Sequence, residues 1–302
     1  MGWTSQDDLI TQLTVNGKGD TVTTTKTLAA AQVAGTWTLL AGHAGYPPAA
    51  TFASGADLTY APTDDTWSEG TIYTGGDVST ATKHFLTAGA CAVAAAGAPW
   101  YIMAIDLVGY VNLGAYTAGN VTSTGTKTVT MTAIGSGAGK GDRYPNGQGL
   151  RMFVAADTAM GANAPTCIIN YLDTAGNAGA TTTFTSTASL PVGALLNTGA
   201  AANKYNPFLP LAAGDTGVSD IVSLVWAGTA HASGTVIIGL CKPLWSIPLP
   251  ATGLYSKMDL VNAFPSMRQI KDGANIQFLL FQTGATTSAG TVNVDFDYGY
   301  GG

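Results

Sequence analysis

Apolar and polar residues alternate with a period of two along most of this chain, and this alternation restricts it to β-structure. From Val292 to Tyr298 every second residue is apolar, while Asn293, Asp295 and Asp297 occupy the positions between them. Successive side chains of a strand point to opposite faces of its sheet, so this pattern is typical of a strand with one buried and one solvent-facing side.

Turns rich in glycine and proline separate such segments, and almost no sequence is left between them for helices. A parallel sheet needs long crossovers between its strands, so we expect an all-β fold of antiparallel sheets, packed as a β-sandwich or jelly roll. The β region covers residues 19–302, as one domain or as two β subdomains. Residues 257–263 are predicted to form one short helix within it. Strands are predicted over residues 21–28, 36–40, 82–87, 100–111, 126–133, 150–155, 166–172, 180–186, 221–226, 235–240, 276–282 and 292–298.

Residues 1–18 differ from the rest and predict a short N-terminal helical arm. Thr4 or Ser5 can cap a helix, and Asp7 and Asp8 fall in its first turn, where the helix dipole favours negative charge. Its apolar stripe is too small to make a core alone, so the arm is expected to dock on a neighbouring subunit or another protein surface, with packing on its own β domain as the alternative. The predicted interface residues are Trp3, Leu9, Ile10 and Leu13.

Charge is scarce, and its scarcity excludes several classes of partner. Charged residues make up 10% of the 302 residues, against about a quarter in ordinary proteins. The net charge of −6 comes without a basic cluster, which argues against binding to nucleic acid. No apolar run is long enough to cross a bilayer, so no membrane partner is expected. A surface with few charges to desolvate suits contacts that become buried against neighbouring subunits.

The N-terminus lacks the basic and then apolar pattern of a signal peptide, so we expect assembly in a reducing cytoplasm. Cys91, Cys167 and Cys241 are odd in number and far apart, which predicts unpaired, buried thiols.

The glycine-rich stretch IGSGAGKGDRY, at residues 134–144, resembles a phosphate-binding loop in composition alone. Such a loop needs a glycine five residues before its Gly-Lys pair and a hydroxyl residue after the lysine. Ile134 stands at the first position and Gly141 at the last. We therefore predict a connecting turn that binds no nucleotide, and no cofactor is expected.

No pattern predicts a catalytic residue or a metal site. No serine has the G-x-S-x-G spacing of a nucleophile elbow. His43, His84 and His231 lie in unrelated contexts, and no two are close enough in sequence to ligate one metal from a single element.

Asp295 and Asp297 are the one carboxylate pair whose spacing is compatible with a catalytic or metal-binding role. Alternate positions of a strand place both on one face, roughly 7 Å apart, near the spacing of some paired-acid sites. A solvent-facing polar edge is the favoured interpretation, since the sequence shows neither an apolar environment nor a third carboxylate. With Asn293 beside them, a weak Ca²⁺ site is the remaining alternative.

Three stretches resemble a known class of protein. They are AGTWTLLAGHAGYPPA at 34–49, KYNPFLPLAAGDTGVSDIVSLVWAGTAHASGTVIIGLCKPLWSIPLP at 204–250, and DLVNAFPSMRQIKDGANIQFLLF at 259–281. In these turn motifs the chain is similar to structural proteins that tailed bacteriophages encode alongside their capsid genes. The resemblance covers most of the chain after residue 30 and carries over no catalytic residues.

The resemblance implies a β-rich, non-enzymatic protein located in the virion. It further implies a capsid decoration or cement protein that stabilises the head, in contact with the major capsid protein and with copies of itself in a homo-oligomer. Two alternatives are a tail or fibre component that binds host glycans, and a virion-borne glycan hydrolase. A cluster of exposed aromatic rings would favour the first, and two carboxylates at roughly 5 to 9 Å in a cleft would favour the second.

Overall fold

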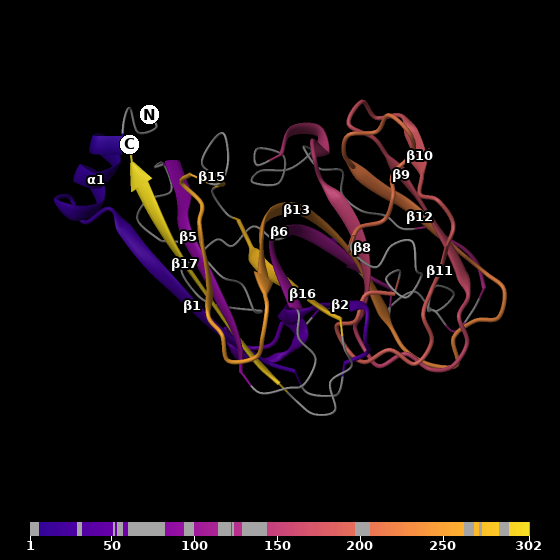
Figure 1. Ribbon diagram of the computed structural model, residues 1–302. Helices are drawn as coiled ribbons and strands as arrows, with labels where there is room; N and C mark the ends of the chain where they lie inside the picture. The colour runs from indigo at the N-terminus through magenta and orange to yellow at the C-terminus, as the bar shows by residue number, and fades with distance from the viewer. Residues whose placement is uncertain are drawn as a thin grey trace.

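The computed structural model describes residues 6–28, 32–50, 52, 57–59, 82–93, 100–113, 122, 124–128, 144–196, 206–262, 269–271, 274–283 and 290–301. Within these residues the chain forms one α-helix, α1 (Gln6–Thr14), and three sheets (Figure 1). All pairings between the described strands are antiparallel, and the sheets pack face to face. The predicted all-β class with a short N-terminal helix is therefore confirmed.

The first sheet, sheet A, joins the two ends of the chain. Strands β1 and β17 pair over nine residues, from Gly19 opposite Gly299 to Thr27 opposite Thr291. The strand order is β14 (Ser256–Asp259), β5 (Thr82–Val93), β17 (Thr291–Gly301), β1 (Gly19–Thr27) and β3 (Ala44–Tyr46), and β15 (Gln269–Ile270) also pairs with β5.

Sheet B lies in the middle of the molecule and sheet C lies on its far side (Figure 1). The order in sheet B is β2 (Thr36–Leu39), β16 (Ile276–Gln282), β6 (Trp100–Asn112), β13 (Val236–Leu249) and β8 (Arg151–Ala156), with β4 (Asp57–Thr59) also paired to β6. The order in sheet C is β10 (Ala178–Ala180), β9 (Thr166–Leu172), β12 (Asp220–Ala227) and β7 (Gly125–Thr128), with β11 (Phe184–Thr185) also paired to β9. Short 3₁₀ turns occur at η1 (Leu40–Gly42) and η4 (Pro145–Gly147).

The long pair β6–β13 contributes to two apolar cores. Its register shifts between Leu240 and Cys241 and again between Pro243 and Trp245. Such β-bulges bend a strand and change which residues face the core. Before the bulges, the even-numbered residues Val236, Ile238 and Leu240 of β13 pack toward sheet C. After them, the odd-numbered residues Trp245, Ile247 and Leu249 pack toward sheet A.

Aromatic rings fill the core between sheets A and B. Phe85 of β5 lies with its ring centroid 5.2 Å from that of Phe296 on β17 and 6.1 Å from that of Trp245 on β13, in edge-to-face geometry. A third cluster covers the opposite face of sheet B, where Trp37 and Phe281 pack at 5.2 Å. The inner face of sheet A is thus committed to the core, and its outer face is left to solvent.

Most predicted strands lie where the sequence places them, and two predictions are wrong. Residues 257–263 form no helix where the structure describes them, because β14 (Ser256–Asp259) pairs with β5 and the Asp259 carboxylate then accepts the backbone N–H groups of Val261 and Asn262 in a turn. The predicted strand 180–186 is split into β10 and β11, since the Thr181 hydroxyl accepts the Ile169 N–H within the ladder.

Two other predicted segments are described in part. Strand 126–133 is seen as β7 (Gly125–Thr128), and residues 129–133 lie outside the described residues. The glycine-rich stretch 134–144 lies outside them as well, apart from Tyr144.

Candidate functional site

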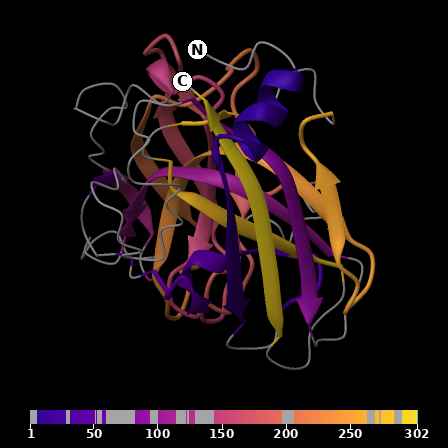
Figure 2. The same ribbon diagram turned by 90° about the vertical axis from the view of Figure 1, so that its left-hand side faces the viewer.

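Sheet A presents a polar face to solvent, and this outer face carries a network of polar side chains from four strands and the segment before β14. Register places Thr21 of β1, Asp297 of β17 and Thr87 of β5 in one row across the sheet. The next row holds Thr23, Asp295 and Gly89. Figure 2 shows this sheet in front, with α1 at the end of it where β17 finishes.

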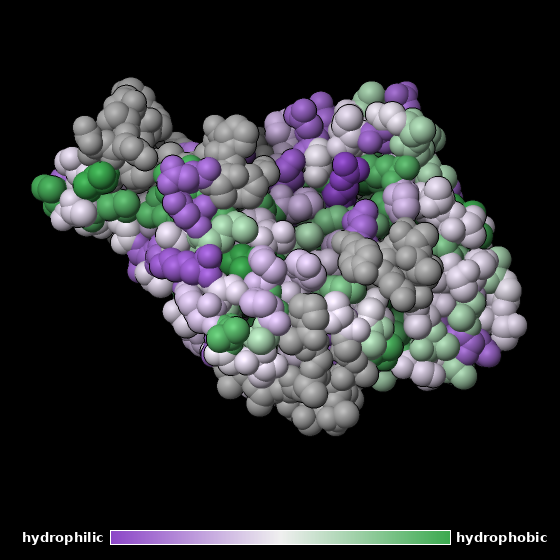
Figure 3. Space-filling model, in the orientation of Figure 1, coloured by the Kyte–Doolittle hydropathy of each residue, from purple (hydrophilic) through white to green (hydrophobic). Residues whose placement is uncertain are grey.

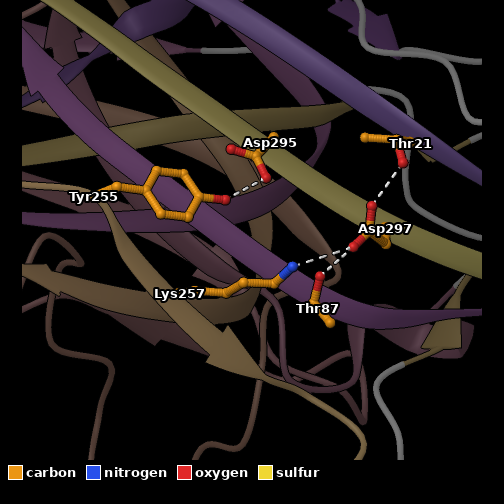
Figure 4. A network of polar contacts seen from close by, with 6 residues as sticks. All are labelled: Thr21, Thr87, Tyr255, Lys257, Asp295 and Asp297. Carbon is orange, nitrogen blue, oxygen red and sulfur yellow. Dashed lines mark hydrogen bonds and ion pairs between the residues drawn. The ribbon is translucent and has the colours of Figure 1, made fainter.

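Asp297 is fully engaged by its neighbours (Figure 4). Thr21 Oγ1 donates to Oδ1 at 2.6 Å, Thr87 Oγ1 donates to Oδ2, and Lys257 Nζ lies 3.7 Å from Oδ2. Partial burial alone would raise the pKa of Asp297, but these hydroxyl donors and the ammonium group lower it below the ordinary value. This carboxylate is therefore ionised and serves to tie β1, β5, β14 and β17 together.

Asp295 has a different neighbour. Tyr255, which precedes β14, donates its hydroxyl to Asp295 Oδ2 at 2.6 Å (Figure 4). The phenol reaches β17 by lying across Gly89, where an added Cβ would stand 1.8 Å from the Tyr255 hydroxyl. Partial burial and the hydrogen bond to Asp295 raise the pKa of Tyr255. Asp295 and Asp297 thus share a face, as the alternation predicts, on an open sheet surface and not in a cleft.

Helix α1 docks at one end of this face. Leu13 packs over Gly19, since a Cβ at Gly19 would lie 2.8 Å from Leu13 Cδ2. Ile10 is 56% exposed, and Val15, just after the helix, is 76% exposed. The hydrophobic surface over α1 is visible at the left-hand tip of Figure 3.

The predicted interface residues are therefore described unevenly. Ile10 faces solvent and Leu13 contacts the sheet. Leu9 lies within α1, and nothing is described of its side chain; Trp3 lies outside the described residues.

Exposed aromatic residues at sheet A do not gather into a platform. Tyr46 of β3 and Tyr255 beside β14 are each about half exposed, at 50% and 52%. Tyr255 extends from one edge as far as Asp295 on β17, which is still two strand spacings, roughly 10 Å, from β3 at the other edge. A glycan-binding surface of stacked rings is therefore not formed by these two residues.

Lys26 is a buried cation that the sequence pattern does not single out. Its side chain points from β1 into the molecule, and Nζ donates to the backbone carbonyl oxygens of His43, Pro47 and Pro48 at 3.2, 2.7 and 3.2 Å. Burial lowers the pKa of Lys26 to about 8. The lysine holds the 43–48 turn, within the first stretch of the phage resemblance, against the edge of sheet A.

A serine and a histidine also meet in the core, a pair that their separation in sequence conceals. Ser186 Oγ and His231 Nε2 lie 2.8 Å apart, and both side chains are buried. Burial lowers the pKa of His231. The His231 ring packs edge-on to Trp226, with centroids 6.1 Å apart. A nucleophile must meet its substrate, so we assign this pair to packing and not to catalysis.

The remaining chemical groups are equally enclosed. Cys167 and Cys241 are buried free thiols whose pKa is raised by burial, whereas Cys91 is only half-buried, contrary to expectation. A cavity of about 60 Å³ beside Asp157 and Gly193 has room for water but not for a sugar. Across the described ranges, His, Cys, Asp and Glu form no group of three that could hold a metal ion. Within the same ranges, no helix is both long and apolar enough to cross a membrane.

Residues 207–218, within the second stretch quoted in the sequence analysis, have a structural role. Tyr171 of β9 donates its hydroxyl to Asp215 Oδ2 at 2.6 Å and accepts the Ala212 N–H at 2.6 Å. Burial and the hydrogen bond to Asp215 raise the pKa of Tyr171 to about 12. Gly217 admits no side chain, because a Cβ there would stand 2.2 Å from the Gly147 carbonyl oxygen. These contacts fix a loop over sheet C.

Neither a protein-family model nor a curated protein matches this chain. The solved structures that it matches include the infectious bursal disease virus Gt strain, at 9% identity and a TM-score of 0.21, over 97% of this chain and 86% of that one. The VP2 subviral particle of the same virus matches at 8% identity and a TM-score of 0.18, over 96% and 85%. Likeness at this level assigns no function to the chain.

Proposed function

We propose that this chain is a non-enzymatic structural component of a tailed-phage virion, and that it decorates and cements the capsid head. It attaches to the major capsid protein through the α1 end of sheet A and forms a homo-oligomer on the shell. The resemblance of three stretches to phage structural proteins supports this role. So does the low charge of the chain, since few charged groups must be desolvated at a contact.

The observation that carries the proposal is the exposure of Ile10 on the docked helix α1 and of Val15 directly after it. Fully burying such side chains is worth about 1.5 to 3 kcal/mol each. A modest contact of this size becomes effective when many copies bind one particle together.

No specific observation favours either alternative, glycan binding or glycan hydrolysis. The exposed tyrosines at sheet A come from opposite edges, which does not favour glycan binding. The carboxylates Asp295 and Asp297 lie on an open face and are bonded to Tyr255, Thr21 and Thr87, which does not favour glycan hydrolysis.

Cosedimentation with heads of the encoding phage, assembled without this chain, tests the proposal. The double variant Ile10→Asp and Val15→Asp should keep the melting temperature and lose binding. Val222→Asp is the matched control, because Val222 is an exposed apolar residue of β12 in sheet C. Binding by the double variant at the level of the control would reject attachment through α1.

Removing residues 1–15 is a second variant that spares the β region. Lys18 must stay, since its carbonyl oxygen accepts the Tyr300 N–H at 3.0 Å. The truncated chain should remain folded and fail to bind heads. Loss of the β-sheet signal in circular dichroism would instead show that α1 is part of the domain's own core.

A further inference from the structure

We infer that the outer face of sheet A docks a protein surface that brings an arginine side chain to Asp295 and Tyr255. This inference rests on the proposed function, because it names the chemistry of the capsid surface that meets this face. It adds a second contact beside α1 and assigns a binding role to the carboxylate pair.

Asp295 is the carboxylate of the pair with acceptor capacity to spare. A carboxylate has about four acceptor sites, and Asp295 accepts one hydrogen bond from the described residues, that of Tyr255. Asp297 has three partners in Thr21, Thr87 and Lys257. An incoming donor therefore finds its acceptor at Asp295.

The ring of Tyr255 lies next to that acceptor. Because Gly89 has no side chain, the ring extends over β5 with 52% of the residue exposed and its hydroxyl at Asp295. A guanidinium group stacks on a tyrosine face and donates in a planar fork to a carboxylate. Tyrosine and carboxylate side by side therefore favour arginine over lysine.

The charge of this outer face favours a different protein over a second copy of this chain as its partner. The described outer face carries Asp259, Asp295 and Asp297 against two ammonium groups, Lys257, which is paired with Asp297, and Lys271, which donates to Gln269 at the end of the sheet where β15 pairs with β5. Two copies meeting through this same face would oppose like charges, which costs binding energy. A basic face of another protein complements it.

The test measures binding of the full chain to heads assembled without it, at low and high salt. Asp295→Asn keeps an oxygen for Tyr255 and removes the charge, so the fold should be unchanged. We expect about tenfold weaker binding, the size of one charge-assisted hydrogen bond, and a smaller salt dependence than the wild type shows. The control is Asp173→Asn, which makes the same charge change in the β9–β10 turn of sheet C.

The outcomes separate this inference from the proposed function. If Asp295→Asn binds heads like the wild type while the α1 variants do not, the arginine contact is wrong and attachment through α1 stands. If the wild-type chain fails to bind heads, both are wrong. Self-association of the wild type that Asp295→Asn abolishes in sedimentation velocity would assign this face to a second copy and overturn the inference.

Discussion

Lys26 and His43 form a coupled pair of buried bases, in which the lysine ammonium donates to the backbone carbonyl oxygen of the histidine at 3.2 Å. Burial, and then the positive charge of Lys26, lowers the pKa of His43 from 6.5 to about 4. The imidazole is therefore neutral at pH 7, and acid must force a second positive charge into the same part of the molecule.

Because of this pair, we expect the free energy of unfolding to fall in acid. Between pH 6.5 and pH 4 the unfolded chain binds a proton at His43 and the folded chain does not, so the free energy of unfolding falls as the pH falls. The loss approaches about 3 kcal/mol at pH 4. Urea unfolding at pH 7, 5.5 and 4.5 measures it, and His43→Gln should flatten the dependence. An equally steep loss in His43→Gln would place the acid-sensitive group elsewhere.

Gly89→Ala tests the geometry over sheet A. The new Cβ would collide with the Tyr255 hydroxyl, and the half-exposed ring can move away at little cost to stability. We expect loss of the bond to Asp295, a change in unfolding free energy below about 1 kcal/mol, and a lower pKa for the Tyr255 phenol. Ultraviolet absorbance titration measures this pKa, with Tyr255→Phe identifying the signal. An unchanged titration would show that the ring does not lie over Gly89.

Tyr171→Phe tests the anchor of the 207–218 loop. The variant removes the donor to Asp215 and the acceptor of the Ala212 N–H, both in a partly buried site. We expect a loss of about 1 to 3 kcal/mol in unfolding free energy and faster hydrogen exchange at the Ala212 amide. Tyr255→Phe, which removes a hydroxyl at the exposed face, should cost less. Equal costs would mean that the Tyr171 hydroxyl does not hold the loop.

Strand prediction from the sequence succeeds where each strand is an apolar segment bounded by turns. The predicted ranges 166–172 and 276–282 match β9 (Thr166–Leu172) and β16 (Ile276–Gln282). It stops short at β13 (Val236–Leu249), of which only residues 235–240 are predicted, and the part left out contains Pro243 and Pro248, residues that are unfavourable inside a sheet. In the structure β8 pairs only with Val236–Cys241 of β13. Both prolines lie beyond this pairing, where β6 is the one described neighbour of β13, so no second strand requires a backbone N–H donor at these positions.

The candidate site is predictable from the sequence only where strand alternation determines it. Alternation alone places Asp295 and Asp297 on one face. Tyr255 reaches Asp295 only because the residue opposite Asp295 on β5 is Gly89, which has no side chain to block the ring. Lys26 lies at every second residue from Val22, so the alternation places it on the buried face of β1. The carbonyl groups that accept from its ammonium belong to a turn about 20 residues away, and no local pattern encodes that contact.

Electron cryomicroscopy of the virion of the encoding phage tests the central proposal most directly. We expect density for this β-fold in many copies on the head shell, with the α1 end of sheet A against the major capsid protein. Density for the chain at the tail or its fibres, or virions that lack the chain altogether, would contradict it.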